Sequence, residues 1–350
     1  MSNYRGVIMS GDYVTQLNTV LKPNYTLGIS VLDLFAGCGG LALGFEAQGF
    51  ETHGFEKDSD AVQTYRRNLD RPCDHIELTI DTVYSEADVV IGGPPCQPFS
   101  VGGHQRGLDD SRDGFPVFVK AIEKVRPKIW MFENVRGLMY QNKWYLEEIM
   151  HRLENLGYTI DAKMLNAVQY GVPQNRERLI VVGHKGGFLF PKPLHDKVTV
   201  GEALGATAFS VPPESKFLTS SMDTYVAKYE KASYCKVPRD LHLDKPSRTL
   251  TCRNIAAPTG DMMRVRLPDG RRRRILIREA ARLQSFPDWF TFEGTETSQY
   301  YQIGNAVPPL LSYHIAASVK SYLEQHRDTD ASYQYVRKEC LTQLDLFAAD

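Results

Sequence analysis

The stretch ISVLDLFAGCGGLALGFE, residues 29–46, decides the fold. Residues 29–34 suit a buried strand, the glycines that follow suit a turn, and residues 41–46 suit a helix. This succession is typical of a nucleotide-binding βα unit. Gly37 and Gly39 allow a ligand to approach the backbone, which a side chain would prevent. The glycine spacing also fits the loose dinucleotide pattern, so NAD or FAD stays open as the ligand.

Acidic residues are expected at the ends of the next two strands. Residues 51–55 predict a strand ending at Glu56, whose carboxylate suits hydrogen bonds with ribose hydroxyls, although a solvated charge is the alternative. Residues 76–80 predict a third strand, and Asp81 after it could meet an adenine amino group. These features predict an α/β fold with a Rossmann-like, doubly wound and mostly parallel sheet.

The run GGPPCQPFS, residues 92–100, presents a cysteine just beyond a predicted strand at 88–91. Chemistry gathers at the carboxyl ends of parallel strands, and the rigid Pro95 holds the Cys96 thiol in one direction. Cys96 is therefore a candidate nucleophile, although a lone cysteine can also be a small buried hydrophobe. The polar, glycine-rich continuation to about Asp113 predicts a mobile lid.

A carboxylate and two arginines follow. Residues 128–132 predict a buried strand that ends in Glu133-Asn134-Val135, which would place the Glu133 carboxylate beside the Cys96 loop if the two strands are neighbours. Arg176 and Arg178 adjoin a predicted strand pair. Residues two apart face the same side of a strand, so the pair could grip an anion or orient a base. Surface arginines on an edge strand are the alternative.

The composition shifts between residues 186 and 274, which predicts a second, smaller domain. Near its end, a Pro-Asp-Gly turn at 268–270 predicts a hairpin with arginines at 271–274, a run that is usually a solvated face but could meet phosphates. The expected division is an N-terminal extension at 1–28, a first domain at 29–185, the second domain at 186–274, a segment returning to the first domain at 275–327 and a tail at 328–350.

Composition narrows the class of protein. The chain has 350 residues, of which 42% are hydrophobic and 24% charged, and a formal net charge of −1, so bulk charge argues neither for nor against nucleic acid. None of the six cysteines forms a CxxC pair, which predicts neither a zinc site nor a disulfide framework. Free thiols and the lack of a secretory or membrane-spanning apolar run predict a cytoplasmic protein.

Six segments together resemble one family, the bacterial DNA (cytosine-5-)-methyltransferases of the modification type. In order they are DLFAGCGG at 33–40, GGPPCQPFS at 92–100, ENV at 133–135, QNRER at 174–178, REAARLQSFPDWF at 278–290 and QIGNAVPP at 302–309. The resemblance implies a catalytic and cofactor-binding domain at 29–185, a target-recognition domain at 186–274 and a last helix that completes the cofactor site.

The resemblance also implies the roles of site residues. Cys96 would add to carbon 6 of a cytosine, Glu133 would hold ring nitrogen 3 and the exocyclic amine, and Arg178 with Arg176 would orient the base. The methyl donor would be S-adenosylmethionine, leaving as S-adenosylhomocysteine, with no metal required. The implied cofactor residues are Phe35, Gly37, Gly39, Glu56, Asp81, Pro94 and Asn305.

The substrate implied is double-stranded DNA with the target cytosine rotated out of the stack. The expected DNA-binding residues are Gln97, Ser100, Arg253, Asn254, Arg271, Arg272, Arg273 and Arg274, with the arginines from Arg264 onward on phosphates. A monomer associated with the nucleoid is expected, with no membrane, and a cognate restriction endonuclease could share its site without contacting it.

Three other functions compete with this interpretation. A tRNA-directed branch shares some of the motifs, but this chain lacks the Cys-Phe-Thr signature of that branch. A non-catalytic DNA-binding relative would not need Cys96, Glu133 and Arg178. A nicotinamide-dependent oxidoreductase explains the glycine turn alone and leaves the other motifs without a role.

Overall fold

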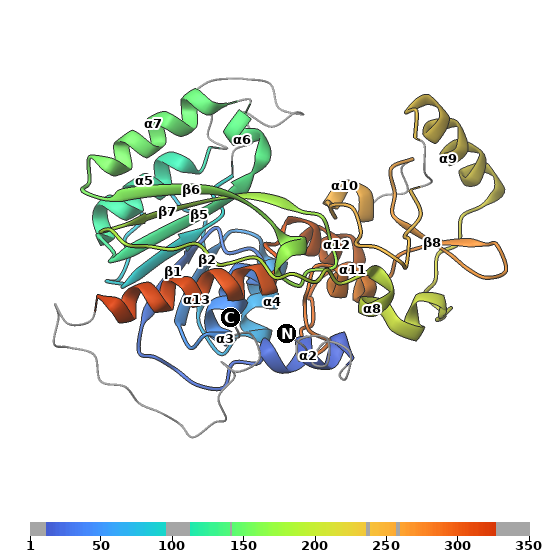
Figure 1. Ribbon diagram of the computed structural model, residues 1–350, viewed down its shortest axis with the longest axis horizontal. Helices are drawn as coiled ribbons and strands as arrows, with labels where there is room; N and C mark the ends of the chain where they lie inside the picture. The colour runs from blue at the N-terminus through green and yellow to red at the C-terminus, as the bar shows by residue number, and fades with distance from the viewer. Residues whose placement is uncertain (1–11, 96–112, 141, 236–238, 257–259, 327–350) are drawn as a thin grey trace.

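The fold is built on one twisted sheet, seen in the computed structural model, which describes residues 12–95, 113–140, 142–235, 239–256 and 260–326 (Figure 1). Its strand order is β3-β2-β1-β4-β5-β7-β6. The strands are β1 Ser30–Leu34, β2 Glu51–Glu56, β3 Cys73–His75, β4 Val89–Gly92, β5 Ile129–Val135, β6 Thr159–Asn166 and β7 Glu177–His184.

Along the sheet, the strand pairing changes once from parallel to antiparallel. The strands from β3 to β5 pair in parallel, whereas β7 pairs antiparallel with both β5 and β6. Because β1 and β4 are neighbours, the two glycine-rich turns leave the sheet side by side at its carboxyl edge. The predicted doubly wound, mostly parallel α/β fold is confirmed.

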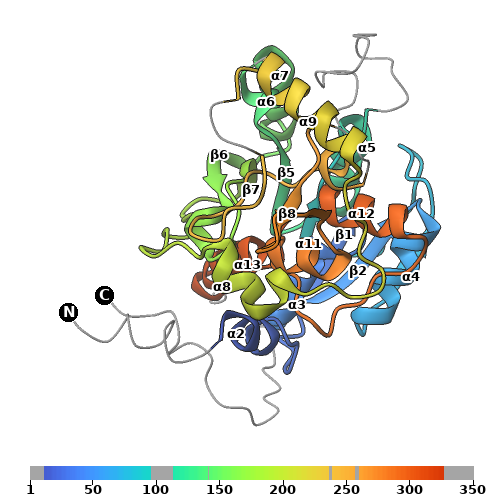
Figure 2. The same ribbon diagram turned by 90° about the vertical axis from the view of Figure 1, so that its right-hand side faces the viewer.

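Helices cover both faces of the sheet, as Figures 1 and 2 show. One face packs against α5 Phe115–Val125, α6 Arg136–Tyr140 and α7 Lys143–Glu154. The other packs against α2 Tyr13–Val20, α3 Gly40–Ala47, α4 Ser59–Asn68 and α13 Pro309–Gln325. The helix α13 lies directly on α3, where a Cβ added at Gly44 would stand 2.4 Å from the backbone nitrogen of Tyr313. Only glycine permits that approach.

Most of the remaining elements form a smaller lobe beside the sheet (Figure 1). They are α8 Val200–Leu204, η4 Gly205–Phe209, α9 Ser220–Ala232, α10 Cys252–Ile255, β8 Arg264–Arg266, β9 Arg272–Arg274, α11 Ile277–Leu283 and α12 Glu296–Asn305. The short helix η3 Ala167–Tyr170 follows β6 and instead contacts α13, where Tyr170 lies beside His314. Buried residues of this lobe such as Leu250 and Val265 belong to the same apolar cluster as α3 and α13. Among the described residues, no helix has the length and apolar character needed to span a membrane.

One strand prediction was wrong. The third strand is β3, which pairs Cys73 with Gly54, and not residues 76–80. Ile76 and Ile80, whose apolar character suggested a strand, are 40% and 52% exposed. The predicted strand from 128 that ends in residues 133–135 is confirmed as β5, which β7 pairs as far as Val135.

One buried carboxylate lies near the end of α3. Glu46 of α3 accepts a hydrogen bond from the hydroxyl of Thr52, and that hydroxyl also contacts Tyr65 at 2.7 Å. Burial raises the pKa of Glu46 to about 7. The folded protein therefore favours the protonated form of this group more than the unfolded chain does. Its contribution to stability is complete below the ordinary pKa of 4.5 and is lost as pH rises through about 7.

The substitution Glu46→Gln should flatten this part of the pH dependence. The shift from 4.5 to about 7 corresponds to about 3 kcal/mol of unfolding free energy between pH 4 and pH 8. Urea unfolding at pH 5 and pH 8 should show a smaller loss of stability in the variant than in the wild type. Glu123→Gln, at an exposed position on α5, is the control. An equal loss in wild type and Glu46→Gln would contradict the assignment.

Candidate active site

An ion pair joins two of the predicted catalytic residues. The Nε atom of Arg178, on β7, lies 2.6 Å from Oε1 of Glu133, on β5, and both side chains are nearly buried. The antiparallel register sets Arg178 opposite Val135, so the start of β7 meets the end of β5. The nearest charged neighbour of the carboxylate is thus a guanidinium that can fix its orientation.

The beginning of the cysteine loop lies beside this ion pair. A Cβ added at Gly93 would be 3.8 Å from Oε2 of Glu133. The side-chain amide of Asn134 donates to the carbonyl of Pro94 at 2.9 Å, which ties the loop to β5. The amide of Gly114 donates to the Pro95 carbonyl at 2.9 Å. The predicted residues Cys96, Gln97 and Ser100, and most of the predicted lid, lie outside the described residues.

The predicted cofactor turn adopts a left-handed backbone at three of its residues. Phe35, Gly37 and Gly39 all have positive φ angles, of 59°, 55° and 89°. A Cβ added at Gly37 would meet no atom within 4 Å, so the space above this residue is open. The amide of Gly37 donates to Oε2 of Glu56 at 2.9 Å, while Oε1 accepts from Lys57 and Asp58. Remaining lone pairs on this carboxylate can accept hydroxyl groups.

An aspartate under the same turn has no protein partner. Asp33 is 1% exposed, and neither carboxylate oxygen has a hydrogen-bond partner among the described residues. Burial, followed by the nearby charges of Glu56 and Glu46, raises the pKa of Asp33 well above its usual value. An unsatisfied buried carboxylate beside an open glycine turn fits a site that receives a polar ligand.

The other predicted cofactor residues are placed differently. Pro94 is buried at the loop start, and Asn305 is the exposed last residue of α12, with its Oδ1 3.6 Å from the sulfur of Cys252. Asp81 is exposed in the irregular segment after β3, and its amide donates to Thr79. Because the expected third strand is absent at 76–80, Asp81 does not stand at a strand end as predicted.

Arg176 is a buried support and not a free side chain. It is 1% exposed and donates to the carbonyls of Leu250 at 2.6 Å, Gly304 at 3.1 Å and Ala306 at 2.9 Å. Burial, followed by the charge of Arg178, lowers the pKa of Arg176. The two arginines, which the sequence pattern treated alike, therefore have different roles. Arg176 joins three segments of the chain through hydrogen bonds, whereas Arg178 forms an ion pair with Glu133.

The two predicted base-reading residues of α10 also differ. Arg253 is exposed, whereas Asn254 is 3% exposed. The Asn254 side chain accepts from the amide of Thr251 and donates to the carbonyl of Thr249, both at 2.9 Å. These hydrogen bonds close a helix cap, so the amide of Asn254 is not presented to a DNA base.

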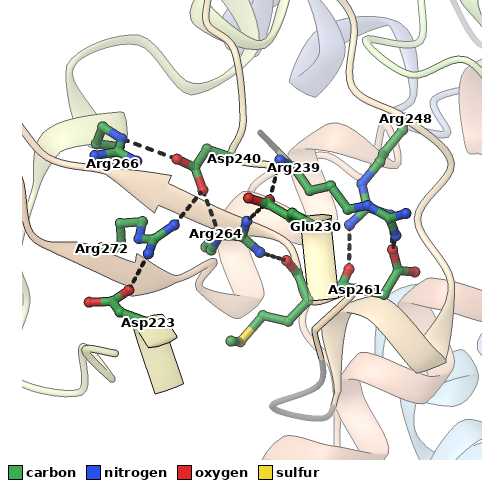
Figure 3. Close-up of polar contacts among 10 residues, drawn as sticks. Asp223, Glu230, Arg239, Asp240, Arg248, Asp261, Arg264, Arg266 and Arg272 are labelled. Carbon is green, nitrogen blue, oxygen red and sulfur yellow. Dashed lines mark hydrogen bonds and ion pairs between the residues drawn. The ribbon is translucent and has the colours of Figure 1, made fainter. Parts of the chain in front are cut away.

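Arginines of the hairpin β8–β9 are held by carboxylates of the chain itself, as Figure 3 shows. Arg264 is fully buried between Glu230 of α9 and Asp240. Arg272 contacts Asp223 and lies 3.8 Å from Asp240. Two arginines outside the hairpin, at 239 and 248, share Asp261 in the same way.

The expectation of a phosphate-binding arginine run is therefore corrected at several positions. Arg273 is fully buried and forms a two-pronged ion pair with Glu279 at 2.7 and 2.8 Å. Arg274 donates to the carbonyls of residues 255 and 256. Arg271 alone of the run is an exposed side chain, paired with Asp269 at 2.7 Å. A phosphate could not reach Arg273 or Arg264 without breaking buried ion pairs.

Some residues that support the candidate site and the small lobe were not predicted from the sequence. Asn134 stands in the ENV motif, next to a residue that was predicted, so its neighbour was the available signal. Gln174, which is fully buried, accepts from the amide of Leu250 and donates to the carbonyl of Leu283. The acids at 223, 230, 240 and 261 carry no sequence pattern that pairs them with arginines. Among the described residues, no group of His, Cys, Asp or Glu is arranged to hold a metal ion.

Comparison with known proteins identifies the class of this site. The model of the family "C-5 cytosine-specific DNA methylase" matches residues 29–216 and 206–321. The chain belongs to this family, and it is of the restriction-modification type. It is 55% identical to type II methyltransferase M.AplI of Arthrospira platensis, over 92% of this chain and 95% of that protein. It is 35% identical to M1.HphI of Haemophilus parahaemolyticus, over 84% and 87%.

Solved structures share the fold. A methyltransferase of Entamoeba histolytica, EhMeth, matches with a TM-score of 0.66 at 18% identity, over 85% of this chain and 98% of that one. The Dnmt2 methyltransferase of S. pombe matches with a TM-score of 0.65 at 18% identity, over 84% and 98%. With the family established, the nicotinamide alternative has no further support.

Replacing Arg273 should lower stability strongly. Arg273→Gln leaves Glu279 buried without its cation, which should lower the free energy of unfolding by about 3–5 kcal/mol. Arg271→Gln, at a side chain that is 58% exposed, should change it by less than about 0.5 kcal/mol. Urea denaturation of both variants measures the difference. Equal stability of the two variants would show that the buried Arg273–Glu279 ion pair does not stabilise the fold as expected.

Proposed function

We propose that the chain transfers a methyl group from S-adenosylmethionine to carbon 5 of a flipped cytosine in a short duplex DNA site. The observation that carries the proposal is the Glu133–Arg178 ion pair, 2.6 Å long, beside the Gly93–Pro95 segment that leads to Cys96. A thiol that follows this segment and a carboxyl group beside it would suit the activation of one pyrimidine ring.

Carbon 5 of cytosine is a weak nucleophile, so the ring needs activation. The thiolate of Cys96 forms a bond to carbon 6, and the electrons of the double bond move toward ring nitrogen 3. Glu133 supplies the proton or hydrogen bond that nitrogen 3 needs and accepts one from the exocyclic amine, and Arg178 fixes the orientation of the Glu133 carboxyl group. Carbon 5 then takes the methyl group. Loss of the carbon 5 proton to water, with the return of the nitrogen 3 proton to Glu133, re-forms the double bond and expels the thiolate of Cys96.

The residues around the glycine turn fit the methyl donor. A bound S-adenosylmethionine would supply a sulfonium, which is already an activated leaving group and needs no metal. Glu56 would hold the ribose hydroxyls, Phe35 would contact the adenine, and Asn305 would lie near the amino-acid end. The open space above Gly37 would take the methionine part. Asp33 and Asp81 have no assigned contact in this proposal.

The DNA would lie against the small lobe and the carboxyl edge of the sheet. Flipping the base costs a few kcal/mol, so contacts with the duplex must offset this energy. Arg253 and Arg271 are exposed and can reach DNA, whereas Asn254 and Arg273 are occupied within the protein. Gln97 and Ser100, near Cys96 in the sequence, would contact the strand beside the flipped base.

The biological role that fits is protection of DNA against a cognate endonuclease, by an enzyme acting as a monomer. Bisulfite sequencing of DNA from a host that expresses the chain should reveal one short methylated site. The method reports the reaction, the position and the sequence context together. Unmethylated DNA in a host with confirmed expression would refute the proposed function.

Cys96→Ala should abolish methylation while S-adenosylhomocysteine and DNA still bind. A duplex with 5-fluorocytosine at the target position should form a covalent adduct with the wild type, because fluorine blocks proton loss, and none with Cys96→Ala. Cys252→Ala tests the cysteine that lies near Asn305, and it should retain the adduct. An adduct that disappears with Cys252 and persists without Cys96 would reassign the nucleophile.

Glu56→Gln should weaken cofactor binding. Hydrogen bonds to a charged carboxylate contribute about 1.5–3 kcal/mol, so the Kd for S-adenosylhomocysteine should rise by roughly 10–100-fold. Isothermal titration calorimetry measures this Kd. Glu51→Gln, at the other end of β2 and paired with Arg71, is the control. A Kd unchanged from wild type would remove Glu56 from the cofactor site.

A further inference from the structure

A group of exposed side chains follows Glu133 at the end of the sheet. They occupy the short stretch that joins β5 to α7, and we call them the α6–α7 corner: Val135, Arg136, Tyr140, Lys143 and Trp144. Val135, Tyr140 and Trp144 are 42%, 63% and 53% exposed. Large apolar side chains exposed together mark an interaction surface more often than a solvated one.

The corner is continuous with the catalytic ion pair. Val135 lies opposite Arg178 in the strand register and two residues after Glu133, so it shares their face of the sheet. The guanidinium of Arg136 pairs at 2.8 Å with Glu177, the residue before Arg178. A substrate that reaches the ion pair therefore comes close to the corner as well.

The cations of the corner are available for exchange. The Arg136–Glu177 pair is 61% and 42% exposed, and the Lys143–Glu147 pair is 71% and 61% exposed. Exposed pairs of this kind contribute little to stability, so a phosphate can replace the carboxylate without a large loss. The buried ion pairs of Arg264 and Arg273 offer no such exchange.

The aromatic residues give the corner a shape suited to nucleic acid. The guanidinium of Arg136 lies over the ring of Tyr140, 5.0 Å from its centroid, and the ring of Trp144 lies 5.6 Å from that of Tyr145. A cation held on an exposed ring can meet a phosphate while the ring packs against the adjoining sugar or base.

We propose that the α6–α7 corner binds the sugar–phosphate backbone of the duplex beside the target cytosine. Arg136 and Lys143 contact phosphates, and Tyr140 and Trp144 pack against deoxyribose. The inference rests on the proposed function, since it takes duplex DNA as the substrate. Figure 1 shows α6 on the side of the larger lobe nearer the small lobe, so the duplex would be held from both sides.

The first test removes the two exposed rings. The substrate is a duplex carrying the site found by bisulfite sequencing. Tyr140→Ala with Trp144→Ala should raise the Kd for this duplex by about tenfold or more, measured by fluorescence anisotropy. The kcat at saturating DNA and the Kd for S-adenosylhomocysteine should stay within about threefold of wild type, because the corner does not touch the reacting atoms. Leu189→Ala, 75% exposed after the far end of β7, is the control and should leave all three unchanged.

The second test removes the cation. Arg136→Gln should reduce the slope of log Kd against log salt concentration by about 0.9, the value for one lost phosphate contact. Lys120→Gln, on α5, removes a similarly exposed cation that pairs with Glu123 at 2.9 Å, and it should leave the slope unchanged.

Two results would overturn the proposal. The first is a duplex Kd and a salt slope equal to wild type in the corner variants. The second is a concentration-dependent dimer, seen by sedimentation velocity, that the Tyr140→Ala and Trp144→Ala changes abolish, because the corner would then bind a second copy of the chain. Methylation of the duplex by wild type separates the outcomes. If the wild type methylates DNA and the corner variants bind the duplex as tightly as wild type, the proposed DNA contact of the corner is refuted and the proposed function stands.

Discussion

A single buried guanidinium holds the parts of the site together. Arg176 donates to the carbonyls of Leu250, Gly304 and Ala306. The first lies in one segment of the chain, and the other two lie in a second segment far from it in the sequence. A buried cation is costly unless its hydrogen bonds are made, so separating any of these segments from the others would leave part of the charge unsatisfied. Thus the small lobe and the end of α12 are both fixed relative to the start of β7. Arg178, which pairs with Glu133, follows two residues further on.

The one antiparallel strand described in the sheet, β7, explains why that ion pair exists. Parallel strands place their ends at one edge, so β4 and β5 bring Gly93 and Glu133 together. A parallel neighbour would set its own beginning at the opposite edge. Because β7 is antiparallel, its first residues lie beside the last residues of β5, and Arg178 reaches Glu133. The candidate active site therefore depends on both kinds of strand pairing.

The sequence predicted the elements well where burial follows a simple period, and poorly where partners are distant. The strands that carry Glu56 and Glu133 follow from their apolar residues, although β5 runs further than its apolar run. The apolar residues at 76 and 80 predicted a strand, yet they are exposed. The burial of Arg273 could not be predicted, because a pattern of charges does not reveal which acid will fold against it. The split between Arg176 and Arg178 depends on backbone carbonyls of remote segments, which no motif encodes.

The buried arginines change how the small lobe can recognise DNA. The helix α9 buries a single residue, Val226, so apolar packing holds it weakly. Its Asp223 and Glu230 instead bind Arg272 and Arg264 of the hairpin, within the ion-pair network of Figure 3. These two cations hold the hairpin β8–β9 against α9, and because carboxylates already neutralise them, they attract phosphates only weakly. Under the proposed function, a lobe built in this way would present a rigid surface to DNA, and attraction to the backbone would come from cations that stay exposed, such as Arg253 and Arg271.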